Sequence, residues 1–488
     1  MEKNNHKAVH TKDKNPKLAK VEATNRIDTK LNAAKLDTKG ISVRKADDFS
    51  EWYTQVIQKA DLAEYSSVSG CIVYKPTSYA IWEKIRDVVD VKLKSFGVKN
   101  AYFPLLIPEK LLKKEATHVA GFTPEVAWVT EAGDTKLDER LAIRPTSETI
   151  MYDSYSRWVR SHRDLPLKIN QWNNVIRWEF KHPVPFLRGR EFLWNEGHTV
   201  FASKKEAEAE REQIVGMYTE VCENYLALPV LVGKKSTGET FAGAEYTISL
   251  EMLMPSGKAI QGPDFHHDGQ IFAKAFDISF LNEKGVKEFA WQNTWAITTR
   301  VLGVLFAVHG DDKGLVMPPK VAPTQVVIVP IVFEDSKNAV IFKAKEIAKK
   351  LNEKGIRVEL DDREGYTPGW KFNEWEVKGV PIRIEFGPKD MEKHQVMLVR
   401  RDTGEKQALP IAALVDEVEL VLTQIQDNLF KKAKTHLETS IVTIDNISEA
   451  KKQLEKQKLL FAPWCNEAEC EEKFKADKDQ QARELLAL

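Results

Sequence analysis

The sequence predicts a large sheet-containing region, followed by a smaller α/β domain and a short C-terminal region. Three observations support this organisation. The stretch from Arg177 to His198 has two apolar, strand-like ends around a loop that contains prolines and a glycine. A proline-rich linker follows at 317–323. Beyond it, strand-like and helix-like segments alternate, which is typical of a largely parallel sheet.

The length and composition indicate a soluble protein of several domains. The chain has 488 residues, enough for roughly three domains of ordinary size. Its formal net charge is zero, so a nucleic-acid partner would have to bind a local basic patch. No apolar run approaches the ~20 residues of a membrane span, and the N-terminus lacks a secretory signal. The four cysteines do not form a disulfide framework, and we expect a cytoplasmic protein.

The N-terminal part predicts a tail, a helix and a strand. Residues 1–40 are rich in Lys and Asn, which predicts a basic flexible tail, either a solvated extension or an RNA-tethering arm. Residues 79–96 have apolar side chains at helical spacing, and Gly97 follows as a stop signal. The apolar run 101–108 predicts a strand. Because this run contains Pro104, we expect the strand to lie at a sheet edge or at an interface. The helix and strand form either a dimer seam or an intrachain contact.

The next segment predicts a loop and then a helix. Residues 109–140 are mixed in character, and we expect a mobile loop around Gly121 and Gly133. A helix should begin near Ser147, with a hydroxyl group as its cap. A plain capped helix start is the alternative to a binding role for this segment.

The central stretch carries unusual charges for a buried hairpin. They include Arg177, Arg188, Arg190, Glu179, Glu191 and Glu196. Charged side chains are rarely buried unless they are paired or bound to a ligand. The arginine fork suits phosphate and carboxylate groups. The segment is therefore either a salt-bridged hairpin or a sheet floor that binds a polyanion.

The motifs between residues 203 and 308 differ in how strongly they indicate a binding site. Residues 203–228 predict a helix. Residues 233–237 resemble the end of a phosphate-binding loop but lack its earlier glycine, which excludes a Walker A motif. His266 and His267 lack further ligands at suitable spacing, so we do not expect them to bind a metal. Arg300 precedes an apolar helix, where it is well placed for an anion.

The region after the linker predicts an α/β domain. Its expected strands are 326–332, 356–360, 382–386 and 396–399, and its expected helices are 336–352, 370–377 and 411–430. Charged loops lie beside Trp370 and Trp375, and basic groups interleaved with aromatic rings are typical of a single-stranded RNA site. Ordinary surface charge is the alternative. Cys465 and Cys470 are half of a zinc site, but no Cys or His follows them, so zinc is not expected.

The chain lacks a glycine-rich phosphate loop, a hydride-cofactor fingerprint and a serine elbow, so arginines must hold any phosphates directly. This arrangement resembles class II aminoacyl-tRNA synthetases, and more closely prolyl-tRNA synthetases of the archaeal and eukaryotic type. The resemblance covers about 45–470. Its motifs are RPTSE at 144–148, RWEF at 177–180, REFLWNEGH at 190–198, the segment that ends at Arg300, and GVPIRIEFGP at 379–388.

The resemblance implies a fold, a reaction and partners. The fold would be an α+β catalytic domain on an antiparallel class II sheet, an α/β anticodon-binding domain and a small α+β C-terminal domain. We expect their boundaries at 41–318, 319–430 and 431–488. The implied enzyme is a homodimer that joins L-proline to ATP as prolyl-adenylate, with Mg²⁺, and then transfers proline to the 3′ end of tRNA(Pro).

The family's site residues fall on matching positions of this sequence. Thr146, Glu148 and His266 match proline ligands, and Arg177 matches the catalytic arginine that bridges the proline carboxylate and the α-phosphate. Glu179, Arg188, Gln261, Thr298 and Arg300 match ATP contacts, and Gln261 also matches a Mg²⁺ contact. Candidates for reading the anticodon are Asp361, Arg363, Lys371 and Glu385.

The sequence departs from the family in two places. Asp264 stands where a threonine that touches ATP is expected, and the second cysteine pair of a zinc site is missing. Only about sixty residues separate the second motif from Gln261, which leaves no room for the large editing insertion of the bacterial type. We therefore expect no editing of that kind.

Three alternatives to a prolyl enzyme remain open. A threonyl, seryl or glycyl enzyme would use another amino acid, although a threonyl site would need metal ligands. A non-catalytic, tRNA-binding relative would be expected to lose Arg177 or Arg300, and both are present. An acyl-adenylate ligase with another acceptor would not need an anticodon-binding domain.

Overall fold

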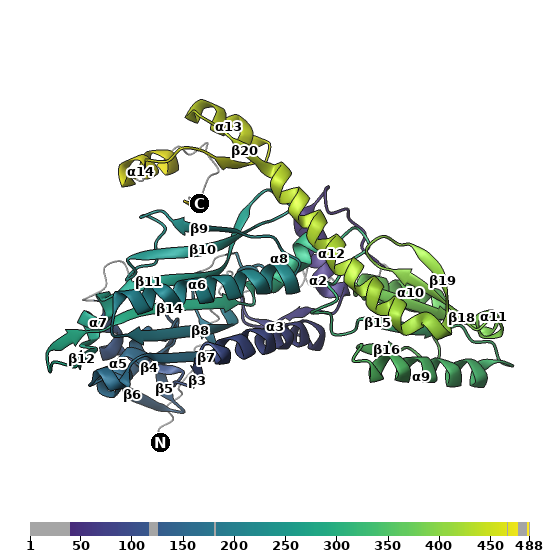
Figure 1. The fold of residues 1–488 in the computed structure, drawn as a ribbon, viewed down its shortest axis with the longest axis horizontal. Helices are drawn as coiled ribbons and strands as arrows, with labels where there is room; N and C mark the ends of the chain where they lie inside the picture. The colour runs from purple at the N-terminus through teal and green to yellow at the C-terminus, as the bar shows by residue number, and fades with distance from the viewer. Residues whose placement is uncertain (1–39, 117–124, 180–181, 466, 477–485, 488) are drawn as a thin grey trace, which may run out of the picture.

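The computed structural model describes residues 40–116, 125–179, 182–465, 467–476 and 486–487. The tail expected at 1–40 lies outside these residues except for Gly40, and so does the loop expected around Gly121. Figure 1 shows a large sheet with its helices, an α/β domain beside one end of a long helix, and a small C-terminal part at that helix's other end. No helix in the described ranges has both the length and the apolar character that a membrane span needs.

The large sheet is antiparallel except at one edge. Its order is β22-β9-β10-β11-β14-β8-β7-β3, and β3 pairs with β7 in parallel. Its strands are β3 (Lys99–Asn100), β7 (Leu167–Ile176), β8 (Glu191–Phe201), β9 (Leu231–Lys235), β10 (Tyr246–Leu253), β11 (Ala259–Gly269), β14 (Trp291–Thr298) and β22 (Leu486–Ala487). The sheet confirms the predicted α+β class. Residues 233–237, which resemble the end of a phosphate-binding loop, lie partly in β9, an ordinary strand.

Helices pack on both faces of this sheet. One core contains side chains of α2 (Phe49–Lys59), α3 (Pro76–Ser95), α6 (Lys204–Glu220) and α8 (Arg300–His309) around Trp295. A second core joins α5 (Glu148–Trp158) and α7 (Ile271–Phe276) to Val200. Since Trp295 pairs with Gly197 and Val200 pairs with Gln292, the two cores occupy opposite faces of the pleated sheet. The polar side chains described below lie on the α5 face.

The long helix predicted at 79–96 is confirmed as α3. It begins at Pro76, a residue that suits the first turn of a helix because it has no amide hydrogen to satisfy. Its buried side chains include Trp82, Ile85 and Leu93. The chain leaves the helix through Gly97, whose φ of +80° favours glycine.

The single strand predicted at 101–108 is wrong. The structure has β3 before it and β4 (Leu106–Pro108) at its end, and Pro104 lies between them without strand pairing. Strand β4 belongs to a small sheet with β5 (Trp128–Ala132) and β6 (Thr135–Ile143). Gly133 forms the turn between β5 and β6, so the loop expected around it is a hairpin turn.

The remaining elements of the first region connect these layers. They are β1 (Ala63–Tyr65), β2 (Ile72–Tyr74), α4 (Glu109–Ala116), β12 (Ser279–Leu281), β13 (Lys287–Phe289), and two short helical turns at His162–Asp164 and Val221–Tyr225. The helix predicted at 203–228 is therefore α6 followed by the turn at Val221–Tyr225. Its start is fixed by a capping box between Ser203 and Glu206.

The α/β domain has a mixed sheet. Its elements are β15 (Val326–Pro330), α9 (Lys337–Glu353), β16 (Val358–Leu360), α10 (Pro368–Val377), β17 (Ile382–Phe386), α11 (Pro388–Glu392), β18 (Gln395–Arg400), β19 (Lys406–Pro410) and α12 (Leu414–Ser440). The order is β16-β15-β17-β18-β19, in which the first two pairings are parallel and the last two antiparallel. The prediction of a largely parallel sheet is therefore only half correct. The strand β18 follows β17 after the short helix α11 and pairs with it in antiparallel orientation, and β19, which was not predicted, is antiparallel to β18.

The C-terminal part returns to the large sheet. It contains a parallel pair, β20 (Ile441–Thr443) and β21 (Leu459–Phe461), with α13 (Ile447–Glu455) and α14 (Ala468–Ala476). Its last described strand, β22, pairs with β9 at the edge of the large sheet. Figure 1 shows α14 near that edge.

A bidentate ion pair holds the α/β domain against the first region. Arg401 donates from Nη1 to Asp311 Oδ2 over 2.7 Å and from Nη2 to Asp311 Oδ1 over 2.6 Å. Arg401 also donates from Nε to the backbone oxygen of Glu376. Two parallel hydrogen bonds fix direction as well as distance.

We predict that Arg401→Lys weakens this contact, because lysine cannot form the planar fork. A double-mutant cycle with Asp311→Asn, followed by urea unfolding, should give a coupling energy of about 1 kcal/mol, a modest value because Asp311 is half-exposed. Additive effects of the two substitutions would contradict a direct role for the pair.

Candidate active site

The antiparallel pair β7–β8 forms the floor of the site. Glu196 pairs in register with Gln171, and His198 pairs with Ile169. Gly197 lies between Glu196 and His198 and faces the other side, where an added Cβ would sit 2.2 Å from the Trp295 ring. A side chain at 197 would therefore push β8 away from β14 and displace both polar neighbours.

Arg177 follows directly after β7. Its amide donates to the backbone oxygen of Arg190 over 2.8 Å, and its Nε donates to the backbone oxygen of Pro145 over 2.9 Å. Its guanidinium lies over the rings of Phe192 and Trp194, with centroids 5.5 and 5.4 Å away. No carboxylate pairs with Arg177 within the described ranges, so the salt-bridged hairpin does not account for this arginine. Its remaining donors are available to an anion.

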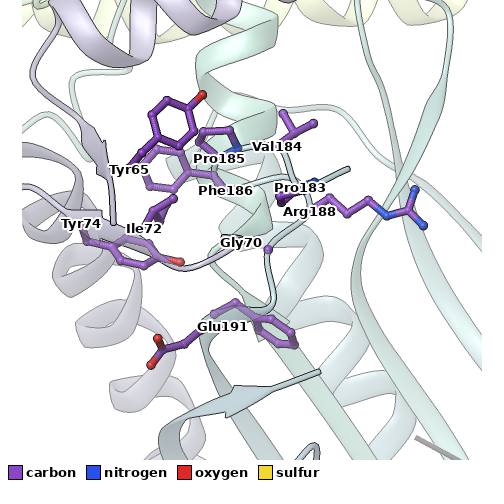
Figure 2. A pocket seen from close by; sticks show the side chains of 12 residues that line it. Tyr65, Gly70, Ile72, Tyr74, Pro183, Val184, Pro185, Phe186, Arg188 and Glu191 are labelled. Carbon is purple, nitrogen blue, oxygen red and sulfur yellow. The ribbon is translucent and has the colours of Figure 1, made fainter. Parts of the chain in front are cut away.

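The loop after Arg177 is covered by the β1–β2 hairpin. Figure 2 shows a pocket lined by Tyr65, Ile72 and Tyr74 of that hairpin and by Pro185 and Phe186 of the loop, with the side chain of Arg188 extending away from them. The rings of Tyr74 and Phe186 lie edge to face with centroids 5.4 Å apart, so the hairpin supports the loop.

Gly70 lets the two segments approach closely. Its backbone oxygen accepts a hydrogen bond from the Arg190 amide over 2.8 Å. Its φ is +83°, and an added Cβ would lie 2.8 Å from Cγ of Arg190. The hairpin therefore needs glycine at this position.

Arg188 and Glu179 are exposed on the loop. The loop reaches the opposite side of the site through Leu187, whose backbone oxygen accepts a hydrogen bond from Nε of Arg300 over 3.3 Å. The structure thus connects the Arg188 loop to Arg300. Glu179 makes no hydrogen bond or ion pair with the other predicted site residues in the part of the chain that the structure describes.

Arg300, Gln261 and Asp264 form one polar cluster. Nη1 of Arg300 donates to the backbone oxygen of Gln261 over 3.2 Å, and Nε2 of Gln261 donates to Asp264 Oδ2 over 2.7 Å. Thr298 lies beside them and accepts a hydrogen bond from the Arg300 amide over 3.1 Å. Burial opposes ionisation of Asp264, but His266, Gln261 and Arg300 outweigh it and hold the pKa of Asp264 below its usual value.

A second cluster surrounds the start of α5. The Thr146 hydroxyl donates to Glu148 Oε2, and both residues are buried. Ser147 is the N-cap residue, but its hydroxyl does not cap the helix, so that expectation is wrong. It donates instead to Glu196 Oε1, and its amide donates to Glu196 Oε2 over 3.1 Å.

Glu196 is the centre of a buried network. It also accepts hydrogen bonds from Gln171 over 3.1 Å and Asn173 over 2.5 Å, and lies 3.2 Å from Nε2 of His198. Burial opposes ionisation of both Glu196 and His198. Their mutual attraction outweighs it, so the pKa of Glu196 is lowered and that of His198 is raised.

His266 forms a wall beside these clusters. Its ring stacks on Phe241 with centroids 4.6 Å apart, and its Nδ1 lies 2.8 Å from Thr247 Oγ1. His267 faces the opposite side of β11, where its Nδ1 lies 2.8 Å from Asn293 Oδ1. The adjacent histidines therefore cannot act as a ligand pair, and no group of three metal-binding side chains occurs in the described ranges.

Asp268 was missed by the sequence analysis. It is fully buried on the same face of β11 as Asp264 and His266, and Thr294 Oγ1 donates to its Oδ1 over 3.4 Å. Burial and the neighbouring charge of Glu148 raise the pKa of Asp268 well above its ordinary value. The alternation of Asp264, His266 and Asp268 along one strand was a signal that the sequence contained.

Arg144, the first residue of the RPTSE motif, has a structural role. It is almost fully buried, and it donates from Nη1 to the backbone oxygen of Phe103 over 2.8 Å and from Nε to that of Asn174 over 3.0 Å. It therefore joins the segment before β4 to the end of β7, and so positions Arg177.

Three of the four predicted anticodon residues lie together in the α/β domain. Asp361 pairs with Arg363 over 2.8 Å and with Lys371 over 3.4 Å. Burial opposes ionisation of Asp361, but Arg363, Trp375 and Lys371 hold its pKa far below the usual range. The guanidinium of Arg363 lies 5.2 Å from the ring of Tyr366, which is itself stacked on Trp370 with centroids 4.1 Å apart.

The fourth, Glu385, lies in a separate group on β17. It pairs with Arg383 over 2.9 Å and with Lys406 over 3.1 Å. Arg383 and Lys406 line a hollow on the sheet, together with Trp375 of α10. Trp375 donates from Nε1 to Asp361 over 2.8 Å, so it connects the two groups.

The chain is similar to known proteins over most of its length. A model of the class II tRNA synthetase core domain (G, H, P, S and T) matches residues 128–309, and a model of an anticodon binding domain matches residues 325–419. The chain is 50% identical over 439 residues to the cytoplasmic proline–tRNA ligase of Arabidopsis thaliana, covering 90% of this chain and 83% of that relative. The proline–tRNA ligase of Natranaerobius thermophilus is 49% identical over 434 residues, covering 89% of each chain. The bifunctional glutamate/proline–tRNA ligase of Mus musculus is 48% identical over 444 residues, covering 89% of this chain and 29% of the relative.

We predict that Asp268→Asn stabilises the protein increasingly as pH rises. The raised pKa means that the folded state keeps a proton that the unfolded state loses above pH ~4. The wild type therefore loses about 1.4 kcal/mol of stability for each pH unit between the two pKa values, and asparagine does not.

The gain in Tm of Asp268→Asn over wild type should be larger at pH 8 than at pH 5 in differential scanning fluorimetry. Asp87→Asn on the exposed face of α3 is the matched control and should show no such trend. An equal or smaller gain at pH 8 would show that Asp268 is ionised in the folded protein.

Proposed function

The chain belongs to the proline–tRNA ligase family, and we propose that it works in two steps. It joins L-proline to ATP as prolyl-adenylate with release of pyrophosphate, and then transfers proline to the 3′ end of tRNA(Pro). The observation that carries this proposal is the position of Arg177, held by Pro145 and two aromatic rings beside the buried Thr146–Glu148 pair. An anion on Arg177 and a cation on Glu148 are the two ends of an amino acid.

Proline fits the chemistry of the first cluster. Its secondary ammonium group would be bound by Glu148 and Thr146, and its apolar ring would lie against His266 and Phe241. The Glu196 network on strand β8 supports this pocket, since the amide and the hydroxyl of Ser147 both donate hydrogen bonds to Glu196. A pocket with one carboxylate and an apolar wall selects a small cationic amine with an apolar side chain.

Arg177 is proposed as the catalytic residue. Its guanidinium would bridge the proline carboxylate and the α-phosphate while a carboxylate oxygen attacks phosphorus. Charge that builds on the phosphorus oxygens would be stabilised by a donor that is already fixed, so reorganisation costs little. The reaction needs no protein nucleophile.

ATP is proposed to lie between the Arg188 loop and Arg300. Glu179 would contact adenine, Arg188 the outer phosphates, and Thr298 and Arg300 further atoms of ATP, with Arg300 on the γ-phosphate side. The link between Leu187 and Arg300 supports this arrangement because it brings the two sides of the site together.

Mg²⁺ fits the oxygen donors near this cluster. Oδ1 of Asp264 is buried without a hydrogen-bond partner in the described ranges, and the side chain of Gln261 contacts the same carboxyl group. These two residues would hold the ion, which when bound neutralises phosphate charge. Asp264, which replaces the threonine expected at this position, is compensated by His266 and Arg300.

We also propose that the enzyme acts as a cytoplasmic homodimer joined through the 79–108 segment. Its domain boundaries are proposed to lie near 318 and 430.

We propose further that the enzyme lacks editing of the bacterial type. Between β8 and Gln261 the chain forms α6, a helical turn, β9 and β10, which occupy the short interval without a separate domain. Release of alanine from misacylated tRNA at a distinct site of this enzyme would contradict the editing proposal.

Binding of tRNA is assigned to the α/β domain. Arg363, with Tyr366 and Trp370, offers a cation over stacked rings, which suits an unpaired base. Lys371 and Asp361 would set the position of Arg363, and Glu385 would accept hydrogen bonds from a base edge after Arg383 or Lys406 turns toward phosphate.

We predict that ATP–pyrophosphate exchange, tested with each of the twenty amino acids, occurs with proline alone. Arg177→Ala should lower the exchange rate about 10²–10³-fold, because it removes a fixed donor to the developing charge. Exchange with another amino acid would indicate a different synthetase. No exchange from folded protein that binds tRNA would indicate a non-catalytic relative.

We predict that Arg363→Ala raises the KM for tRNA in aminoacylation about 10-fold and leaves proline-dependent exchange unchanged, since stacking on one base contributes about 1–3 kcal/mol. Lys350→Ala removes an exposed positive charge from α9 and is the matched control. Equal effects of the two substitutions would contradict a specific role for Arg363.

A further inference from the structure

Trp178 is an exposed tryptophan directly beside Arg177. It is 41% exposed, although its amide is fixed by a hydrogen bond of 2.9 Å to the backbone oxygen of Glu125. The guanidinium of Arg190 lies over the indole ring, with its central carbon 4.4 Å from the ring centroid. An arginine therefore backs the ring, while a large part of the tryptophan stays open to solvent.

The arginine behind the ring is held by the β1–β2 hairpin. Nη1 of Arg190 donates to the backbone oxygen of Ser69 over 3.0 Å, and the Arg190 amide donates to the backbone oxygen of Gly70 over 2.8 Å. An added Cβ on Gly70 would lie 2.8 Å from Cγ of Arg190, so the hairpin lies directly against the arginine side chain. Because both members of the stack are fixed, the ring is oriented before any ligand binds, which lowers the entropy cost of binding.

The stack lies beside the place where the prolyl group is proposed to react. Arg177 and Arg190 continue the β7–β8 pairing, because Ile176 pairs with Glu191 and the Arg177 amide donates to the backbone oxygen of Arg190 over 2.8 Å. Under the proposed function, Arg177 binds the proline carboxylate, and the ribose hydroxyl at the 3′ end of tRNA must reach the carbon of that carboxyl group. The base on the same ribose then lies within one nucleoside of Arg177.

We propose that Trp178, backed by Arg190, stacks on the last base of the tRNA and so positions its ribose for prolyl transfer. This inference rests on the proposed function and adds a tRNA contact outside the α/β domain. The 3′ end of tRNA is single-stranded, and unpaired bases stack on exposed aromatic rings. The positive charges of Arg177 and Arg190 suit the phosphate backbone that accompanies this base.

The stacking contact affects tRNA binding and not the activation of proline. The first proposed step uses proline and ATP alone, so proline-dependent pyrophosphate exchange should not depend on Trp178. Trp178→Phe keeps an aromatic face for the base. Trp178→Leu removes that face but keeps an apolar side chain, so it tests the stacking contact with little change in the rest of the protein.

The test measures the dissociation constants of tRNA(Pro) and of the same tRNA trimmed by its last nucleotide, by filter binding. The wild type should bind the trimmed tRNA about 10-fold more weakly than the intact one. Trp178→Leu should bind the intact tRNA about 10-fold more weakly than the wild type does, and it should not distinguish the two RNAs. Trp178→Phe should keep most of the discrimination. Trp464→Leu, which removes an exposed tryptophan of the C-terminal part, is the matched control and should behave as the wild type.

Three results would overturn the proposal. Discrimination that persists in Trp178→Leu would show that the ring does not contact the last base. Equal affinity of the wild type for the two RNAs would show that no contact with this base contributes to binding. A raised KM for ATP in Trp178→Leu, with unchanged discrimination between the RNAs, would assign the ring to the adenine of ATP.

Proline-dependent exchange of the wild type, measured in parallel, tests the proposed function separately. If the wild type shows no exchange with proline, the proposed function fails. If exchange is normal in both proteins and Trp178→Leu still discriminates between the RNAs, only the stacking contact fails.

Discussion

The buried carboxylate of Glu196 is the constraint on which the site depends. A charge at this depth is stable only with full compensation, and it receives hydrogen bonds from Ser147, Gln171 and Asn173 and the attraction of His198. Each of these bonds fixes a different element. Ser147 fixes the start of α5, Gln171 and Asn173 fix β7, and His198 fixes β8. Loss of Glu196 would leave several buried donors unsatisfied at once, so the network favours one arrangement of helix and strands.

This arrangement places the groups proposed to bind substrate without using them as internal partners. Glu148 follows Ser147 at the first turn of α5, and Arg177 follows the end of β7. Arg177 is positioned by a backbone carbonyl and by aromatic faces, which direct a guanidinium without neutralising it. A carboxylate partner would have held it equally well but would have competed with an anionic ligand.

Periodicity and turn residues were sufficient to predict α3, the strand β8 and the early alternation of the α/β domain. The strand expected at the start of the Arg177–His198 stretch is wrong, because the strand that pairs with β8 is β7, which ends at Ile176. Periodicity and turn residues failed where tertiary contacts decide the structure. Pro104 interrupts the apolar run 101–108, of which only Leu106–Pro108 pairs as a strand, and β19 forms only because β18 is present to pair with it. The roles of Arg177 and Glu148 stay predictions from the family resemblance, whereas Arg144 of the same motifs is bound to two backbone carbonyl groups. Sequence alone does not show which buried arginine already has its partners.

The acidic residues of β11 illustrate how such a site tolerates added charge. Asp264 and Asp268 lie on the same strand face, yet their environments shift their pKa values in opposite directions. Asp264 faces Arg300 and His266, which favour the ionised form, whereas Asp268 is buried near Glu148, which favours the neutral form. A neutral Asp268 does not compete with Glu148 for the cationic group of the proposed substrate. An ionised Asp264 lies beside His266 and Arg300, which balance its charge. The face therefore carries several carboxyl groups without accumulating their full charge in one place.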